Sequence, residues 1–352
     1  MKRRVSFVLT ATALAALVGC SAEAPKKAEM TEPPYVAPQV PGFAEMAYPP
    51  DNPMTKAKVE LGKALYYDKR LSGDGSRSCY SCHVKEKGLT DGLATAVGAY
   101  EAKLTRAAPT MWNVGYYPAL YWDGRSGALE KQVVGAWGGG NMGCTGKDGR
   151  PSADDCATKL NDVAGYKTQF EAVFGAGPIT KENAAKAIAA FMRTIVTTAE
   201  RSAWVRFRQG DQSALAEDAK RGYTVFAEKA KCTNCHDGIL LTDMQFHNVG
   251  IGTKAAKPDV GRFTVTKEEK DTGAFKTPSL FDISKSGPYF HDGSVATLEE
   301  AVDLMARGGI KNAHLDTTNL KPYKLSKEEK ADLVAFLRSL DATYDIADPV
   351  LP

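Results

Sequence analysis

Apolar residues recur at spacings of three and four positions in several segments of the chain. Val59, Leu61, Ala64 and Leu65 follow this period, and so do the apolar positions of residues 187–196. The spacing places these side chains on one face of an α-helix, where they can be buried together. A third segment, close to the C-terminal end, repeats the pattern with Leu333, Val334, Phe336, Leu337 and Leu340.

Helix start signals support the same interpretation. Glu300 follows Thr297, and Glu329 follows Ser326, at the three-residue spacing of a capping box. No run of alternating β-branched residues competes with these helical segments. We therefore predict a mainly α-helical fold in which long Gly- and Pro-rich loops connect the helices.

The first residues have the composition of a secretory signal. Lys2, Arg3 and Arg4 form a positive region, and residues 5–18 are an apolar stretch too short to span a membrane. We expect residues 1–19 to be a signal peptide that directs the chain into an oxidising compartment.

The end of this signal, Leu-Val-Gly-Cys at residues 17–20, resembles the lipobox of bacterial lipoproteins. The resemblance implies that Cys20 carries a lipid anchor and that the protein is membrane-anchored, facing the periplasm or the cell surface. An ordinary signal peptide that contains a cysteine is the alternative. Residues 20–50 are rich in Pro, Ala, Lys and Glu and have no apolar period, so we predict a flexible tether there.

The rest of the chain is long enough for two compact domains, which we predict at residues 51–205 and 206–352. A formal net charge of +3 without a basic run argues against a nucleic-acid partner. Of the seven cysteines, only Cys144 and Cys156 lie outside the signal and two short motifs. Because unpaired thiols are uncommon in an oxidising compartment, we predict a disulfide between them. Two free or metal-bound thiols are the alternative.

The most specific pattern is C-x-x-C-H, the attachment motif of c-type haem. Two thiols at this spacing reach the two vinyl groups on one porphyrin edge, and the adjacent histidine becomes the proximal iron ligand. A zinc or disulfide motif is the alternative for one copy, but two copies in a secreted chain argue against it. Neither copy opens a helix after a strand, which disfavours thioredoxin-like chemistry. We therefore predict two covalently bound haem c groups, one wrapped by each domain, at Cys79, Cys82 and His83 and at Cys232, Cys235 and His236.

Further motifs resemble those of the bacterial di-haem cytochrome c peroxidases and the related MauG-type enzymes. The resemblance runs from about residue 53 to residue 340. The segments that carry it are L-G-K-A-L-Y-Y-D-x-R-L-S at 61–72, R-x-x-P-T-x-x-N at 106–113, Y-W-D-G-R at 121–125, A-F-K-T-P-S-L at 274–280 and G-P-Y-F-H-D-G-S at 287–294. It implies two cytochrome c-like domains with divided roles. The N-terminal haem meets hydrogen peroxide, and the C-terminal haem passes electrons to it.

The resemblance also implies roles for single residues. Trp122 falls at the position of a tryptophan that carries electrons between the haems, and Gln132 at that of a glutamine in the peroxide site. Met305 falls at the sixth-ligand position of the C-terminal iron, where the peroxidases have methionine and MauG-type enzymes have tyrosine. A core tryptophan and a helix-core methionine are the alternatives for the first and last. His247 and His291 are expected to form hydrogen bonds or face a haem propionate.

The chain departs from the family pattern at the N-terminal haem. Many peroxidases place a removable histidine over this iron, where this chain has Ala99, and no histidine lies between His83 and His236. We expect the iron to be five-coordinate or to hold water, open to peroxide. A Tyr100 ligand is the alternative.

Two other family residues are replaced. The catalytic glutamate position falls in the Gly-rich residues 138–142, and carboxylates that could substitute are Asp148, Asp154 and Asp155. The calcium-binding asparagine is replaced by Ala107, although Lys276 and Pro278 could still offer carbonyl oxygens to Ca²⁺ between the domains.

Three functions remain open. The first is a peroxidase that takes electrons from a small donor protein, a cytochrome c or a cupredoxin. The second is a MauG-like enzyme that uses peroxide to oxidise residues such as Trp of a partner protein, which the Met305 ligand disfavours. The third is a di-haem electron-transfer cytochrome without a peroxide step. Family peroxidases are often dimers, so a homodimer is expected as a possible assembly.

Overall fold

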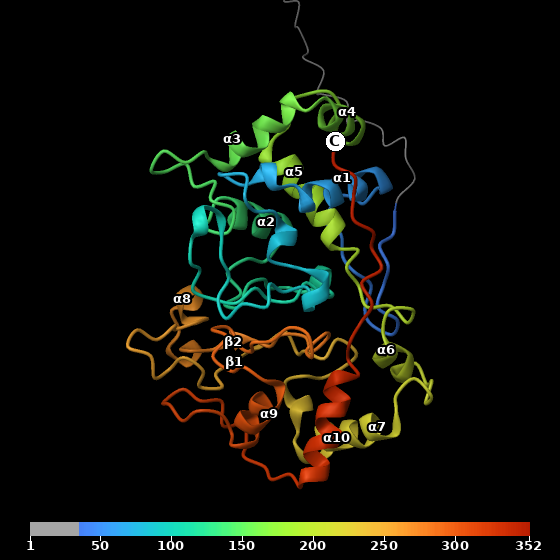
Figure 1. Cartoon of the computed structure of the whole chain (residues 1–352), viewed down its shortest axis with the longest axis vertical. Coiled ribbons are helices and arrows are strands. Elements are labelled where there is room, and N and C mark those ends of the chain that lie inside the picture. The colour runs from blue at the N-terminus through green and yellow to red at the C-terminus, as the bar shows by residue number, and fades with distance from the viewer. Residues whose placement is uncertain (1–34) are drawn as a thin grey trace, which may run out of the picture. The chain divides into compact units, whose positions relative to one another are not determined.

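A computed structural model describes residues 35–352 of the chain (Figure 1). The predicted signal peptide and the acylation site at Cys20 lie outside these residues. The structure is mainly helical, as predicted. Its helices are α1 (Lys56–Tyr67), α2 (Leu129–Trp137), α3 (Ala153–Thr158), α4 (Ala164–Phe174), α5 (Lys181–Met192), α6 (Ala203–Arg208), α7 (Glu217–Thr224), α8 (Phe263–Thr266), α9 (Leu298–Ala306) and α10 (Lys327–Arg338).

Two helix pairs form the cores of the N-terminal and C-terminal halves of the described chain. Helix α1 packs against α5 in the first half, and α7 packs against α10 in the second (Figure 1). Each contact has a glycine at its centre. A Cβ at Gly62 would lie 1.8 Å from the Ala187 carbonyl oxygen, and one at Gly222 would lie 1.9 Å from that of Asp332. Only glycine permits such close helix packing, so the two halves share one construction.

Extended structure is limited to short pairings. Strand β1 (Phe246–His247) runs antiparallel to β2 (Phe275–Lys276). Both predicted capping boxes are present, since Thr297 and Ser326 accept hydrogen bonds from the backbone of Glu300 and Glu329. Within residues 35–352, no helix is both long enough and apolar enough to cross a membrane.

The structure differs from the predicted tether in residues 35–50. Ala37, Val40 and Met46 are buried, and the Val40 amide donates a 2.8 Å hydrogen bond to the Tyr116 hydroxyl. Composition misled the prediction here, because scattered apolar residues without a period can still be buried beneath an irregular loop. The packed part of the chain therefore begins before residue 51.

The C-terminal tail returns from α10 to the N-terminal half, where it ends close to α4 (Figure 1). Arg201 binds Asp345 at 2.7 Å, Lys85 binds Asp348 at 2.9 Å, and the Arg70 guanidinium donates to the Pro352 carbonyl. These contacts tie the last residues to the surface around the first C-x-x-C-H motif.

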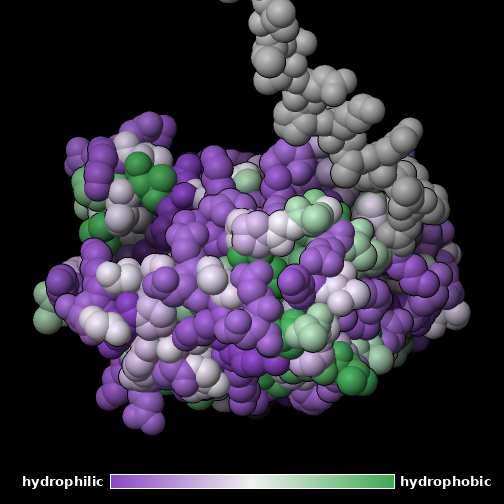
Figure 2. Space-filling view, turned by 90° about the horizontal axis from the view of Figure 1, so that it is seen from above, coloured by the Kyte–Doolittle hydropathy of each residue, from purple (hydrophilic) through white to green (hydrophobic). Residues whose placement is uncertain are grey.

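The predicted disulfide between Cys144 and Cys156 is present. It joins the loop that follows α2 to α3, so it restrains the Gly-rich segment that begins at Gly138. The face seen in Figure 2 is mostly hydrophilic and carries only small, separate apolar patches.

Candidate functional site

Both C-x-x-C-H motifs fold in the same way. Each begins with a short 3₁₀ turn, at Cys79–Ser81 and at Cys232–Asn234. The four cysteines of the motifs are not joined in disulfides. They therefore remain available for another covalent partner.

A backbone carbonyl orients each motif histidine. Nδ1 of His83 lies 3.1 Å from the Leu89 carbonyl oxygen, and Nδ1 of His236 lies 3.0 Å from that of Leu241. Because a carbonyl oxygen can only accept, Nδ1 carries the proton and Nε2 keeps its lone pair. Burial lowers the pKa of both imidazoles, which favours the neutral form that binds a metal.

The two orienting leucines have the same unusual backbone. Leu89 has φ 60° and Leu241 has φ 55°, in the left-handed region that side chains rarely adopt. Both begin the tripeptide Leu-Thr-Asp, at residues 89–91 and 241–243. The sequence analysis missed this repeat, although a comparison of the segments after the two histidines would have found it.

The motif cysteines are thiols whose pKa burial raises, to about 12 for both Cys79 and Cys232. Oxygen, nitrogen and sulfur atoms of Cys235, Asp243 and His247 do lie within 4.8 Å of one another. The His247 ring, however, already contacts Asp243 at 2.8 Å and Asp316 at 2.6 Å, which occupies both of its nitrogens.

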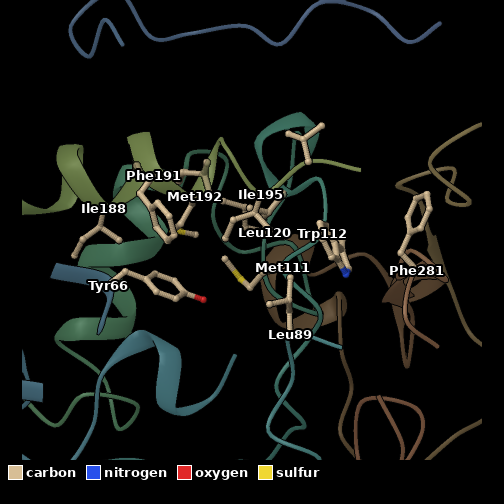
Figure 3. Close-up of a cluster of buried hydrophobic side chains, with 14 of the residues drawn as sticks. Tyr66, Leu89, Met111, Trp112, Leu120, Ile188, Phe191, Met192, Ile195 and Phe281 are labelled. Atoms are coloured by element: carbon tan, nitrogen blue, oxygen red, sulfur yellow. The ribbon is translucent and has the colours of Figure 1, made fainter. Parts of the chain in front are cut away.

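His83 lines an N-terminal cavity of about 520 Å³. Gln132, the residue predicted for the peroxide site, lines the same cavity, and so does Asn141. His83 is the one histidine among the lining residues. A smaller adjoining cavity has a wall formed by Tyr66, Met111 and other apolar side chains, and Figure 3 shows the Tyr66 hydroxyl pointing toward Met111.

The alternative residues suggested for this cavity lie elsewhere. The Tyr100 ring stacks 4.3 Å from the Arg150 guanidinium and does not line the cavity. Asp154 binds Lys181 at 2.6 Å, and Asp155 caps the α3 N-terminus at Ser152. The lining carboxylate is instead Asp123, which Arg106 and Arg125 hold at 2.7 and 3.0 Å.

His236 lines a separate C-terminal cavity of about 220 Å³. Met305, on α9, lines it as well, together with Leu298 and Val302 from the same helix face. The structure therefore brings Met305 and His236 to one cavity. It also shows that the core neighbours of Met305 form part of that cavity's wall.

Trp122 lines both cavities, and so do Lys276 and Pro278. The Trp122 indole donates a 2.9 Å hydrogen bond to the Ala107 carbonyl oxygen. Its ring lies 6.4 Å from the His291 ring, centroid to centroid. The indole thus lies at the boundary between the two cavities.

Backbone hydrogen bonds at this boundary repeat in the two halves. The Ala107 amide donates to the His291 carbonyl oxygen at 2.7 Å, and the Lys276 amide donates to that of Trp122 at 2.8 Å. Ala107 and Lys276 each stand two residues before a proline, at Pro109 and Pro278. Each half therefore binds the other through the same pair of turns.

Charged residues reinforce this junction. Arg106 binds Asp123 in its own half and Asp259 in the other, both at 2.7 Å. Burial alone would raise the pKa of Asp259, but its hydrogen bonds with Arg106 and the Gly261 amide lower it overall. The Asp259 carboxylate is therefore charged at neutral pH and holds the halves together.

His291 has an unsatisfied nitrogen in the C-terminal cavity wall. Its ring stacks on Phe275 at 3.6 Å and is 3% exposed, and its Nε2 has no hydrogen-bond partner within the described residues. Burial lowers its pKa to about 4. A buried polar atom without a partner is costly, so a group bound in the cavity would satisfy it.

The position at which relatives hold calcium has no asparagine side chain. Ala107 stands there, and its carbonyl oxygen accepts the hydrogen bond from the Trp122 indole. The Lys276 side chain is buried, 4.3 Å from the Tyr117 ring centroid. Burial lowers the pKa of this ammonium group to about 8.

Comparisons with known proteins agree with this arrangement. Residues 56–213 match a model of the di-haem cytochrome c peroxidase family, and residues 219–341 match a cytochrome c model. Cytochrome-c peroxidase IdrP1 of Denitromonas iodatirespirans is 37% identical over 97% of this chain and 95% of its own length. Methylamine utilization protein MauG of Methylorubrum extorquens is 40% identical over 84% of this chain and 81% of its own.

A solved structure gives the same result. A MauG-like protein associated with microbial copper homeostasis superposes with a TM-score of 0.74 and 32% identity, over 91% of this chain and 96% of the other.

Proposed function

Because the chain belongs to the di-haem cytochrome c peroxidase (MauG) family, we propose that it reduces hydrogen peroxide in the N-terminal cavity with electrons that enter through the C-terminal cavity. Membership makes it an oxidoreductase with two c-type haems. The observation that carries the proposal is the difference between the cavities. His83 lines one with Gln132 and no second histidine, whereas His236 lines the other with Met305.

The residues present fit the two haems. We assign the thioether bonds to Cys79 and Cys82 and to the corresponding pair in the second motif, with His83 and His236 as iron ligands. When bound, the haems supply the one-electron steps and the metal at which the peroxide bond is reduced. The His291 Nε2 atom would donate to a propionate of the C-terminal haem, which accounts for its lack of a protein partner.

The N-terminal cavity can orient peroxide but has no free acid in its wall. The amides of Gln132 and Asn141 both donate and accept hydrogen bonds, yet neither titrates. Asp123, the lining carboxylate, forms ion pairs with two arginines. We infer that solvent supplies the two protons that join two electrons and one peroxide to form two waters.

Trp122 connects the cavities. Its indole lines both and is readily oxidised, so an electron can cross in two short steps instead of one long one. A thioether at the second iron raises the reduction potential, and Met305 would suit that haem to accept electrons from a small cytochrome c or cupredoxin.

A second candidate is oxidation of a partner protein. Relatives named as methylamine utilization protein MauG, at 40% and 34% identity, favour it. The same peroxide cavity would serve both activities, and the difference would lie in where the electrons originate. Met305 distinguishes the candidates, because a thioether stabilises the reduced haem more than a tyrosinate would.

The test is to add one equivalent of hydrogen peroxide to the purified oxidised protein and record absorption and EPR spectra. We expect one high-spin haem, one low-spin haem and a prompt spectral response. Steady turnover with a reduced small cytochrome would support the peroxidase, and oxidation of a partner protein alone would support the second candidate. Two low-spin haems that ignore peroxide would contradict both and leave an electron carrier.

The compartment follows from the N-terminal pattern. Lys2 to Cys20 supports export and acylation, so we propose a periplasm-facing or surface lipoprotein. Replacing Cys20 by serine should release the protein from the membrane fraction. The domain boundaries, a calcium ion between the halves and a homodimer stay predictions.

A further inference from the structure

We propose that Tyr80 is a surface radical site: Tyr66 and Tyr67 carry an oxidising equivalent from the N-terminal cavity to it, and a one-electron reductant such as a small phenol is oxidised there. The proposal rests on the peroxide reduction argued above, because hydrogen peroxide is the oxidant. It gives that reaction a second outlet for oxidising equivalents, separate from Trp122.

Three tyrosine rings form a continuous path from the cavity outward. Tyr66 is 1% exposed and lines the smaller cavity that adjoins the N-terminal cavity, and His83 and Cys79 line this smaller cavity too. Its ring centroid lies 5.7 Å from that of Tyr67, which in turn stacks on Tyr80 at 4.3 Å with an interplanar angle of 19°. Figure 3 shows the Tyr66 side chain extending into the buried cluster from α1. Both steps between the three rings are therefore ring contacts.

The proton partners of the tyrosines decide where the radical rests. A phenol holds a radical at modest potential only if its proton can leave when its electron does. The Tyr80 hydroxyl donates to the Glu86 carboxylate at 3.3 Å, so Tyr80 has an acceptor. The Tyr66 hydroxyl has no hydrogen-bond partner within the described residues, and burial raises its pKa well above the usual value.

Tyr67 is equally unable to give up its proton. Its hydroxyl has no hydrogen-bond partner within the described residues, so no base is in place to take the proton, and burial raises its pKa. Tyr66 and Tyr67 can therefore pass an electron inward but cannot hold the deprotonated radical. Trp122 is limited in the same way, because its indole donates to the Ala107 carbonyl oxygen, which takes no proton.

The chemistry balances at Tyr80. Its phenol gives one electron to the path and its proton to Glu86, which leaves a neutral phenoxyl radical and a carboxylic acid. An external phenol then returns one electron and releases its own proton to solvent, while Glu86 returns its proton to Tyr80. Two such cycles convert one hydrogen peroxide and two phenols to two waters and two phenoxyl radicals, and the two protons that the phenols release equal the two that peroxide reduction takes from solvent.

The position of Tyr80 gives a reductant access. Its ring is half-buried, Glu86 is exposed, and Lys85 beside them is held by Asp348 of the C-terminal tail. The stacked face of the ring is fixed by Tyr67, while its hydroxyl edge reaches the surface. An outlet here protects the methionines of the cavity wall, Met111 and Met192, from oxidation when no donor protein is bound.

The experiment uses the full di-haem protein frozen within milliseconds of adding one equivalent of hydrogen peroxide. EPR should show a tyrosyl radical, and its spectrum should narrow in protein grown with ring-deuterated tyrosine. Tyr80→Phe should reduce the signal about tenfold and slow guaiacol oxidation to a similar degree. Glu86→Gln keeps the phenol but removes the base, so the radical should form more slowly. Tyr223→Phe is the matched control, because Tyr223 packs in the other half against Trp204 and Phe336.

The outcomes separate the two proposals. A haem spectrum that responds to peroxide without a tyrosyl signal, or a signal of unchanged size in Tyr80→Phe, overturns the radical site and leaves peroxide reduction standing. A haem spectrum that does not respond to peroxide contradicts the proposed function and removes the oxidant for Tyr80 as well. A radical lost in Tyr80→Phe, slowed in Glu86→Gln and intact in Tyr223→Phe supports the site.

Discussion

The Trp122 indole and the His291 imidazole meet with ring centroids 6.4 Å apart at an interplanar angle of 66°, and they come from equivalent turns of the two halves. Each ring precedes Asp-Gly, and each follows a residue with positive φ, 66° at Tyr121 and 71° at Phe290. One duplicated turn therefore delivers a ring to the junction from each side. Of the two rings, only the indole is readily oxidised, so only Trp122 is suited to the proposed electron transfer between the cavities.

Replacing Trp122 by phenylalanine should uncouple the cavities. Phenylalanine keeps an aromatic ring at the junction but cannot be oxidised under these conditions. We expect steady-state peroxide turnover with a reduced cytochrome donor to fall on the order of a hundredfold, equivalent to about 2.7 kcal/mol of barrier. The rapid spectral response of the oxidised protein to peroxide should change far less.

Trp204→Phe serves as the control for this change. Trp204 is fully buried and hydrogen-bonded to the Ile239 carbonyl, but it lines neither cavity. Equal loss of turnover in the two variants would show that packing, and not electron transfer, limits the Trp122 variant.

The sequence predicted the residues whose chemistry requires a short spacing. The C-x-x-C-H motif can be recognised from the sequence alone, because porphyrin geometry fixes the spacing between the two thiols and the histidine. The helix pattern and the capping boxes are equally local, so the mainly helical fold followed from them. Met305 and Trp122 needed the family resemblance, since nothing in their immediate neighbours separates them from core residues.

Two features that the sequence did not reveal depend on contacts between segments that are distant in the chain. The Tyr66–Tyr67–Tyr80 path joins α1 to the first haem motif, and Tyr344 reaches it from the C-terminal tail. The burial of Ala37, Val40 and Met46 before α1 likewise depends on partners such as Tyr116. No periodicity marks such contacts, because they are made by irregular loops whose path is set by the packed helices.

Replacing Met305 by alanine should lower the reduction potential of the C-terminal haem. Loss of a thioether ligand removes the preference for the reduced iron, and axial ligands shift haem potentials over a wide range. We expect a decrease on the order of 100 mV in a spectroelectrochemical titration, with the N-terminal haem nearly unchanged. Met46→Leu, a buried methionine that lines neither cavity, should leave both potentials in place. An unaltered potential in the Met305 variant would mean that another residue binds the iron.

Removing the disulfide by the double change Cys144→Ala and Cys156→Ala should destabilise the protein by about 3 kcal/mol, from the loop-closure entropy of the unfolded chain. The 12-residue separation sets this magnitude. Asn141, which lines the N-terminal cavity, stands three residues before Cys144, so release of this segment should also slow the spectral response to peroxide. The loss of stability is checked by urea unfolding monitored by fluorescence. The native protein is measured in the presence and in the absence of reductant. Equal stability of variant and native protein would show that the loop is held by its other contacts.

Glu130→Gln should destabilise the protein at neutral pH but not in acid. Glu130 lies on α2, two residues before Gln132, and binds Arg193 at 2.8 Å and Asn52 at 2.7 Å. Burial would raise its pKa, but the hydrogen bonds from Arg193 and Asn52 lower it overall. A carboxyl with a lowered folded-state pKa stabilises the fold above its unfolded pKa of about 4.3, and the stabilisation disappears as pH falls through the folded-state value.

The variant leaves the Arg193 guanidinium, 5% exposed, without its charge partner. We expect urea unfolding at pH 7 to give the variant a free energy of unfolding about 3 kcal/mol lower than that of the native protein. This difference should narrow below about pH 4, because Glu130 of the native protein then becomes protonated. Glu182→Gln, at an exposed position 3.7 Å from Lys181, should change stability by less than about 0.5 kcal/mol at either pH. If the difference in free energy of unfolding does not depend on pH, the variant is destabilised by altered packing and not by the lost charge. Because α2 also carries Gln132, a loosened helix should slow the reaction with peroxide at pH 7, which links this ion pair to the cavity it supports.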